Sequence, residues 1–581
     1  MRLLLCVILS TLCIASSCSK APKRVGFSQS DDSVPDPSAD PDAGAAIKNA
    51  QTAGDYIANL RCDAPETLRG LRAWRRLSNI EVQNTVVDIF QLSDVDFSQF
   101  PPDLPKKEIF DTMNIESNYI GDSRFAGYEN FAKSLMSKVN ITVLFPCLKD
   151  GAACLSKQLP ALLQNAWRRP SVASEVTDLT TLYTGLLADG LSAENAARST
   201  IEAIVLSHNF LYRSELGVLQ PDNSFVLTDW EMASALSYIL WRRPPNAELR
   251  KMAATNALED PEAIKAVAEK MMADPLAKAA WKDFGGQWLD TARITSSTKK
   301  NAPDFTADVK AKMVAETRDF VSAVMFDPIA PTFKTLMTAD YTPADAVLDT
   351  FYNSKSVSGK TAYVQPERRG VLGQAGFLSS HSTDEMSNPI LRGAFIGERI
   401  LCMDFKGAPP TPTPVKVAGL SSKAIFKAHN SSPTCAGCHT TIDNLGFSLE
   451  NFDYLGKYRT IDEGQPVTVE GTLAVDGKNI PITSPQQMLD AIASSTTAQQ
   501  CWVREAFRYG FGRTEFYWRN IPGRTEQPAL SAQGSLDRCQ IDNATTAMIS
   551  KGGDLKTAII ELIASPGFRY RLKGVPEIQP L

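Results

Sequence analysis

Histidine is scarce in this chain of 581 residues, which has only four: His208, His381, His429 and His439. So few imidazoles exclude a histidine-rich metal store and limit the number of histidine-ligated groups that the protein could hold. A positive excess is also missing, because the formal net charge is −5 and the lysines and arginines are spread along the sequence. We therefore expect no nucleic acid among its partners.

Long apolar runs are missing beyond the N-terminus, so no later segment is predicted to span a membrane. The sequence also lacks a repeat of fixed period, a phosphate-binding loop and a Ser-His-Asp arrangement. Asp443, Glu450 and Asp453 follow one another at helical spacings, and we interpret them as caps or solvated carboxylates rather than as an acid–base pair. No catalytic residue can be named from these patterns.

The first eighteen residues, MRLLLCVILSTLCIASSC, have the features of an export signal. Arg2 is positive, residues 3–14 are apolar but too few to span a bilayer, and small residues precede Cys18. A cysteine in this place resembles the lipobox of bacterial lipoproteins, where the cysteine is diacylated and becomes the first mature residue. We expect lipidation of Cys18, with ordinary signal cleavage as the alternative. Ser19 resembles the residue found in lipoproteins that are sent to the outer membrane.

Residues 19–60 are rich in serine, aspartate and proline and contain almost no large apolar side chains. Such a segment cannot bury enough surface to fold, so we expect a disordered tether. The predicted protein is then a soluble body held at the membrane by its N-terminal lipid. Its location would be the cell envelope, as an outer-membrane lipoprotein that faces the periplasm or the surface.

The remainder is too long for one hydrophobic core, since single cores stop growing beyond about 250–300 residues. We expect mainly α-helical domains, with a small β-hairpin near residues 465–482, where apolar and polar residues alternate around an Asp476-Gly477 turn. Boundaries are placed at polar or proline-rich joints. The predicted segments are a signal at 1–18, a tether at 19–60, helical domains at 61–145, 146–220 and 221–355, a cofactor domain with the hairpin at 356–490, and a helical C-terminal domain at 491–581.

Two helix starts are explicit in the sequence. Ser78 with Glu81, and Thr228 with Glu231, have the spacing of a capping box and precede apolar residues with helical periodicity. The second of these helices is expected to stop before Pro244.

The densest chemistry lies in residues 431–447, SSPTCAGCHTTIDNLGF. Cys435, Cys438 and His439 form the pattern Cys-x-x-Cys-His, which is the attachment signature of c-type haem. Two thiols three residues apart can add to two vinyl groups of one porphyrin, and the next residue brings its imidazole to the iron. We expect one covalent haem c, with thioethers at Cys435 and Cys438 and with His439 as the proximal iron ligand.

Other interpretations of this motif remain open. A thioredoxin-like dithiol would need a βαβ context, which the sequence lacks. A structural zinc ion could be held by His429, Cys435, Cys438 and His439, although a cysteine and a histidine adjacent in sequence seldom both reach one tetrahedral ion. A chance match of a five-residue pattern, with no cofactor, is the third alternative.

No motif fixes the sixth iron position. Methionine or histidine fills it in many electron carriers. The candidates are His381, Met386, Met403, His429 and Met488. If none of them binds, the open position would admit peroxide or oxygen.

The chain has eleven cysteines, of which two lie in the signal, one is Cys18 and two belong to the haem motif. The even remainder of six suggests three disulfides in an exported protein. The expected pairs are Cys147 with Cys154 across a short turn, Cys501 with Cys539 around one helical unit, and Cys62 with Cys402 by elimination. Buried free thiols are the alternative.

Several stretches resemble, in the same order, the planctomycete- and myxobacterium-type cytochrome c proteins built of five consecutive domains of unknown function. The stretches are WRRLSNIEVQNTVVDIF; NAWRRP with HNFLYRSE; LTDWEMASALSYILWRRPP; RRGVLGQAGFLSSHS followed by the haem motif; and CWVREAFRYGFGR with GDLKTAIIELIASPGFRYR. The resemblance implies haem attachment through Cys435, Cys438 and His439 in the fourth domain. Asn444 stands where the family usually has proline, a departure that should not affect ligation.

Three classes of function follow. We favour electron transfer, either to a redox partner protein or within a larger envelope complex. A haem-dependent oxidase or peroxidase acting on a large extracellular substrate is the alternative, because a simple carrier needs only about 100 residues around its haem. The third is a binding or scaffold protein in which haem or zinc is structural.

Overall fold

The computed structural model describes residues 70–93, 95–98, 100–103, 109–113, 120–221, 224–403, 405, 414–429, 433–515 and 528–571. Within these ranges it describes only the backbone of residues 428, 429, 433–438, 440 and 528–535. The predicted signal and tether, with Cys18, and the predicted disulfide partner Cys62 lie outside these residues. Among the helices of the described ranges, none is long and apolar enough to cross a membrane.

The described protein is mainly helical, as expected, with several small antiparallel sheets. Up to residue 221 the helices are α4 (Asn79–Phe90), α5 (Asp122–Lys138), α6 (Ile141–Leu144), the 3₁₀ turn η3 (Leu148–Asp150), α7 (Ala152–Trp167), α8 (Ala173–Ala188), α9 (Ala193–Val205) and α10 (His208–Leu211). The next group is α11 (Asp229–Trp241), α12 (Ala247–Ala254), α13 (Pro261–Met272), α14 (Pro275–Trp288), α15 (Thr291–Ser296), α16 (Ala307–Met325), α17 (Phe333–Thr338) and α18 (Ala346–Tyr352).

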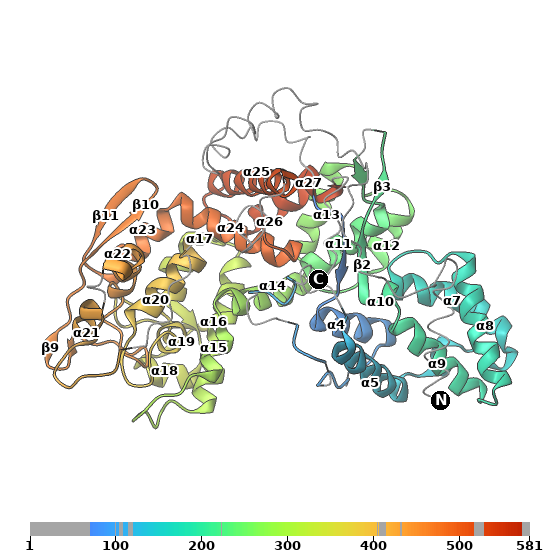
Figure 1. Ribbon diagram of the computed structural model, residues 1–581, viewed down its shortest axis with the longest axis horizontal. Coiled ribbons are helices and arrows are strands. Elements are labelled where there is room, and N and C mark those ends of the chain that lie inside the picture. Colours follow the sequence, from blue (N-terminus) through green and yellow to red (C-terminus); the bar gives the residue numbers. More distant parts are fainter. Residues whose placement is uncertain are drawn as a thin grey trace. The chain divides into compact units, whose positions relative to one another are not determined.

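The second half of the chain carries the motif helix. Its helices are η4 (Val371–Gly373), α19 (Ala375–Ser380), α20 (Pro389–Phe395), the π-helical turn η5 (Ile396–Ile400), α21 (Ser422–His429), α22 (Pro433–Phe447), α23 (Pro485–Ser494), α24 (Thr496–Phe511), α25 (Pro528–Ser550), α26 (Leu555–Ala564) and α27 (Pro566–Arg569). Figure 1 shows α22 beside α20 and β10, two elements with which it is in contact.

The strands of the described ranges form five small sheets. They are β1 (Ala73–Arg76) with β2 (Tyr212–Glu215); β3 (Val218–Leu219), β4 (Phe225–Val226) and β12 (Tyr570–Arg571); β5 (Tyr341–Pro343), β7 (Lys360–Ala362) and β6 (Ser356–Val357); β8 (Ile461–Asp462) with β9 (Gln465–Pro466); and β10 (Gly471–Val475) with β11 (Lys478–Ile482). The pair β10–β11 confirms the predicted hairpin. Its turn residues Asp476 and Gly477 both have positive φ, of 51° and 70°, the conformation that favours Asp-Gly in a two-residue hairpin turn.

Both predicted capping boxes are present. Ser78 Oγ accepts from the backbone of Glu81, whose carboxylate accepts from the backbone of Ser78 at 2.8 Å. Thr228 and Glu231 repeat this exchange at the start of α11, which ends at Trp241, before Pro244. Local sequence therefore determines where these two helices begin, because each box satisfies backbone donors that the helix cannot.

Among the described residues, two large hydrophobic clusters make up most of the core. The larger contains Phe110, Leu236, Leu378, Leu445 and Trp502, so four of the five predicted body segments contribute to it. The other is formed mainly by residues before 212, on α4, α5, α7, α8 and α9. The described residues, all from 70 onward, belong to one compact unit, and the boundaries within it stay predictions.

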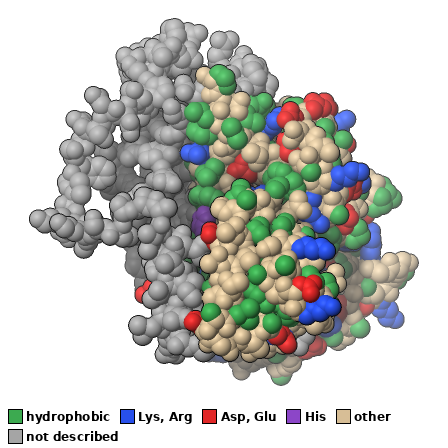
Figure 2. Space-filling model, turned by 90° about the vertical axis from the view of Figure 1, so that its right-hand side faces the viewer, with side chains coloured by type: hydrophobic (Ala, Val, Ile, Leu, Met, Phe, Trp, Pro, Cys, Tyr) green, Lys and Arg blue, Asp and Glu red, His purple; other side chains and the backbone are tan. Residues whose placement is uncertain are grey.

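The face that carries α7 and α8 shows acidic, basic and hydrophobic side chains interspersed (Figure 2). On the described part of this face, the Lys and Arg side chains and the Asp and Glu side chains are scattered, and neither kind forms one large patch. Mixed charge of this kind is typical of an ordinary solvated surface.

Candidate haem site

The motif residues occupy one continuous helix. Pro433 is the first residue of α22, a position that suits proline because its missing N–H would have no helical partner. Cys435, Cys438 and His439 follow at positions i, i+3 and i+4, so their Cα atoms lie on one face of α22. The backbone is therefore arranged as a two-thiol haem attachment requires.

His439 makes a contact that orients its ring. Its Nδ1 atom lies 3.1 Å from Oδ1 of Asp443, one helical turn later, and both side chains are 16% exposed. A neutral imidazole that donates Nδ1–H to a carboxylate presents Nε2 as its lone-pair nitrogen. Metal-ligating histidines commonly have such an outer partner on the second nitrogen. The donor set and ring orientation at His439 thus fit a proximal haem ligand.

The interpretation of Asp443 as a cap or solvated carboxylate is therefore wrong, because it is a half-buried partner of His439. Its spacing of four residues after the motif histidine was the signal available in the sequence, since side chains four apart share a helix face.

Close helix contact holds α22 in place. α20 crosses it at Gly393 and Gly446, where an added Cβ would overlap the carbonyl oxygens of Ile442 and Pro389 respectively. Only a residue without a side chain allows two helix backbones to approach so closely. The same helix buries Leu445 in the main core.

A buried arginine joins the end of α22 to α19 and α20. Arg392 is fully buried and donates to the carbonyls of Leu449 at 3.0 Å, Phe452 at 2.8 Å and Leu378 at 3.0 Å. The guanidinium of Arg392 thus links three separate stretches of backbone in the interior, where polar groups need hydrogen-bond partners.

Glu450 completes this network. Its carboxylate accepts from Ser387 and Arg459, both at 2.9 Å, and lies 3.8 Å from Arg392. Burial raises the pKa of Glu450, and the charges of Arg459 and Arg392 oppose that effect. The prediction of a cap or solvated residue is wrong here, because Glu450 is 1% exposed. Asp453 caps a turn instead of a helix: its Oδ1 accepts from the backbones of Leu455 and Lys457.

A pocket of about 250 Å³ lies beside this network, lined among others by Met386, Lys416, Tyr454, Arg459 and Asp462. Arg459 donates to Asp462 at 2.5 Å in addition to Glu450. Its positive charge is thus already balanced by two carboxylates of its own domain.

The candidates for the sixth iron position lie in different environments. Met386 packs with Phe426 and Phe447 in a small cluster, and Met488 accepts a hydrogen bond from Ser448 Oγ at 2.8 Å. Phe426 belongs to α21, whereas Phe447 and Ser448 lie at and just after the C-terminal end of α22, about 12 Å along the helix axis from His439 at a rise of about 1.5 Å per residue. Met403 is partly buried against the main core, and the His429 side chain lies outside the described residues.

His381 is the fully buried candidate. Its ring packs between Phe377 and Phe395, and Nδ1 lies 3.0 Å from the Phe377 carbonyl oxygen. Burial, with the charges of Arg293 and Arg392, lowers the pKa of His381 to about 3. The imidazole is therefore neutral, which a metal ligand requires. The choice among the five candidates stays a prediction.

The described disulfides confirm one predicted pair and contradict the other two. Cys147 and Cys154 are joined, as expected from their short separation. Cys501 is joined to Cys402 rather than to Cys539, which also excludes the pairing of Cys402 with Cys62. Cys539 is itself disulfide-bonded. The pairing of Cys402 by elimination was wrong because the order of the cysteines in the sequence does not reveal that α24, which carries Cys501, passes the end of η5.

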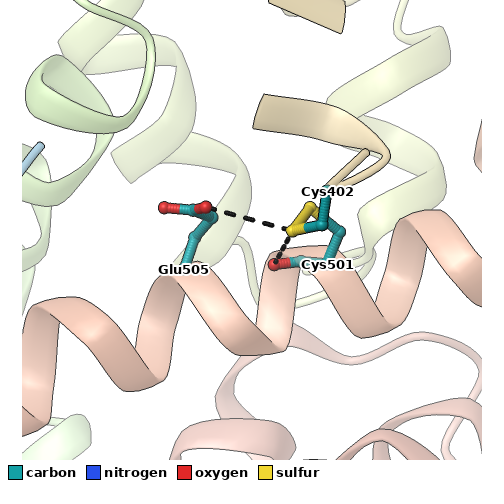
Figure 3. A group of neighbouring side chains, drawn as sticks. All are labelled: Cys402, Cys501 and Glu505. Atoms are coloured by element: carbon teal, nitrogen blue, oxygen red, sulfur yellow. Dashed lines mark hydrogen bonds between the residues drawn. A yellow bond between two sulfur atoms is a disulfide. The ribbon is translucent and has the colours of Figure 1, made fainter. Parts of the chain in front are cut away.

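Figure 3 shows the Cys402–Cys501 bridge beside Glu505, all three on or next to α24 and η5. Within the described ranges this is the one group of three potential metal-ligating side chains, with ligand atoms within 4.8 Å of one another. Because both sulfurs belong to a disulfide, they offer no thiolate to a metal ion.

Four family models match consecutive parts of the chain, each described as a protein of unknown function. They are PSD3 (DUF1587) at residues 75–140, PSD5 (DUF1595) at 154–215, PSD4 (DUF1592) at 227–353 and PSCyt3 (DUF1588) at 368–462. The chain thus contains four domains of the planctomycete cytochrome-c-like family, in the order that the sequence predicted. No curated protein and no solved structure matches.

The last model is named as a cytochrome-c-like domain and covers α22, His439 and the Arg392–Glu450–Arg459 network. A cytochrome c type of protein is therefore indicated. The fifth domain predicted at the C-terminus stays a prediction.

Proposed function

We propose that this protein is a c-type monohaem protein of the cell envelope that transfers electrons. One haem c would be bound by Cys435 and Cys438 through thioethers and by His439 through iron. The observation that carries the proposal is the His439–Asp443 pair on α22, in a segment that matches a cytochrome-c-like domain. The haem, when bound, supplies a one-electron centre, and the chain holds, orients and shields it.

The chain's own residues support that role. α22 fixes the three attachment positions on one face, and the glycine contact with α20 keeps this helix against the body. Arg392 and Glu450 tie the chain after α22 to α19 and α20. A rigid ligand helix suits electron transfer, because a fixed environment reduces the rearrangement that accompanies a change of iron charge.

The decisive test is whether haem is covalently attached to the chain. We would produce the full chain in a host with the cytochrome c maturation machinery and record a pyridine haemochrome spectrum and an intact mass. We expect the mass of one haem and loss of covalent haem in the Cys435→Ala, Cys438→Ala double variant. His208→Asn is the matched control, because His208 lies edge-on to Trp74 and stacks on Tyr212, away from α22 in the sequence. A wild-type chain without covalent haem would overturn the proposal.

The same sample distinguishes the classes of function. A six-coordinate low-spin iron that is indifferent to peroxide supports a carrier, whereas a high-spin iron that reacts with peroxide supports an oxidase or peroxidase. Binding to an envelope polymer that persists in His439→Ala would support a scaffold.

We further propose that Cys18 carries lipid and holds the protein at the outer membrane, exposed to the periplasm or the surface. The support is the short apolar run followed by small residues before Cys18. Labelling with a radioactive fatty acid should mark the wild type, and Cys18→Ser should be unlabelled and leave the membrane fraction. Equal labelling of both chains would exclude lipidation at this cysteine.

A further inference from the structure

We propose that Asp443 sets the reduction potential of the haem, by accepting the Nδ1 hydrogen of His439 and making that imidazole a stronger electron donor to iron. The inference rests on the proposed ligation of haem by His439. It assigns Asp443 a positioning and tuning role, and predicts a haem that favours its ferric state.

The contact is built into the helix. Asp443 follows His439 by four residues, so α22 itself brings the carboxylate beneath the ring, with Nδ1 and Oδ1 3.1 Å apart. Neighbouring residues fix this register: Ile442 is 6% exposed and Leu445 is 1% exposed. The helix cannot rotate Asp443 away without removing these apolar side chains from the core.

Partial burial gives the contact its strength. Both side chains are 16% exposed, so the carboxylate acts in a medium less polarisable than water, where charges interact more strongly. A carboxylate acceptor draws the Nδ1 proton more than a neutral carbonyl does, because it bears a full negative charge.

The hydrogen bond from His439 to Asp443 would change the electron density at the iron. Outer-sphere hydrogen bonds orient a ligating histidine and raise its donor strength, and axial ligand donation is one of the protein's means of setting a haem potential. Negative charge near the metal also stabilises the more positive ferric ion. The reduced protein would thus be a good electron donor, and its partner an acceptor of higher potential.

The test uses the full haem-loaded chain. We would titrate the potential of the wild type, Asp443→Asn and Asp443→Glu by spectroelectrochemistry. We would also record the iron–histidine stretch by resonance Raman on the five-coordinate ferrous form that photolysis of the carbon monoxide adduct produces. Asn keeps the size but removes the charge. We expect it to shift the ferric-to-ferrous equilibrium toward ferrous by about tenfold, equal to about 59 mV for one electron, and to lower the stretching frequency.

The conservative Glu variant should restore most of the wild-type potential. The matched control is Glu470→Gln, which removes an exposed carboxylate just before β10, the strand in contact with α22. It should leave both readouts unchanged. If Asp443→Asn fails to mature, Asp443→Ser, with a smaller neutral side chain, takes its place.

The outcomes separate the two proposals. A wild type without haem overturns the proposed function. A haem-loaded Asp443→Asn or Asp443→Ser protein with the wild-type potential and stretching frequency overturns the tuning role. A lower melting temperature with unchanged potential would assign the pair a purely structural role and would also overturn it.

Discussion

Cys402 and Cys501 are joined by a disulfide although 99 residues separate them in the chain. Cys402 follows η5 in the segment that matches the cytochrome-c-like domain, which ends at residue 462, and Cys501 lies in α24 beyond it. The bridge therefore fastens the candidate haem domain to the C-terminal helices.

Removing this bridge should destabilise the protein strongly. In the chain-entropy account, closing a loop of about 100 residues contributes about 4–5 kcal/mol, whereas a loop as short as that between Cys147 and Cys154 contributes about 2–3 kcal/mol. We expect the Cys402→Ser, Cys501→Ser variant to unfold at a clearly lower urea concentration than the Cys147→Ser, Cys154→Ser variant. Equal midpoints would contradict a special role for the longer loop.

The helix crossing at Gly446 should not tolerate a side chain. Gly446→Ala would drive a methyl group into the Pro389 carbonyl and separate α20 from α22, at a cost of about 2–3 kcal/mol or more. Haem incorporation should fall as well, because α22 carries the attachment residues. Thermal unfolding and haem content measure both effects.

Gly185 in α8 provides the matched control. Nothing lies within 4 Å of a Cβ added there, so Gly185→Ala should be neutral or stabilising by about 1 kcal/mol, the usual gain in a helix. A destabilised Gly185→Ala with an intact Gly446→Ala would show that the crossing is not close.

Loss of the Glu450 charge should lower the free energy of unfolding more than loss of a surface carboxylate does. Glu450→Gln leaves the guanidinium groups of Arg392 and Arg459 in the interior with less opposing charge, which should lower the free energy of unfolding by about 3 kcal/mol. Glu248→Gln breaks the exposed ion pair with Lys270 and should change the free energy of unfolding by about 0.5 kcal/mol or less. Urea unfolding measures both variants. A similar change in the free energy of unfolding for Glu450→Gln and Glu248→Gln would contradict a stabilising role of the buried network.

Glu316 should make stability depend on pH. It is buried in α16, with both carboxylate oxygens accepting from Tyr352 Oη at 2.9 and 2.8 Å. Burial raises the pKa of Glu316 to about 7, although the hydrogen bonds from Tyr352 oppose the rise. The folded state therefore holds a proton that the unfolded chain, with an ordinary carboxyl pKa near 4.5, releases at lower pH.

The contribution of Glu316 is complete below about pH 4.5 and is lost as pH rises through about 7, a change of about 3 kcal/mol. Glu316→Gln removes the titration, so relative to wild type it should gain about that amount of stability between pH 4.5 and pH 8. Denaturant unfolding at both pH values checks this, and parallel curves for the two proteins would contradict the buried protonated state.

Local sequence was sufficient for several elements. The capping boxes at Ser78 and Thr228 began the helices where predicted, and Asp476-Gly477 closed the predicted hairpin. The nearby pair Cys147–Cys154 was also found, because seven residues can be bridged by a turn. In each case the deciding interaction lies within a few residues, so the pattern contains all of it.

Interactions between distant parts were not predictable in this way. The pairing of Cys501, the burial of Glu450 and the close approach of Gly446 to Pro389 each depend on a partner from another element. The sequence alone determined the haem motif, the helix starts and the order of the four matched domains. Only the tertiary structure decided which charges were buried and which cysteine met Cys402, because packing brings together side chains that the chain order keeps apart.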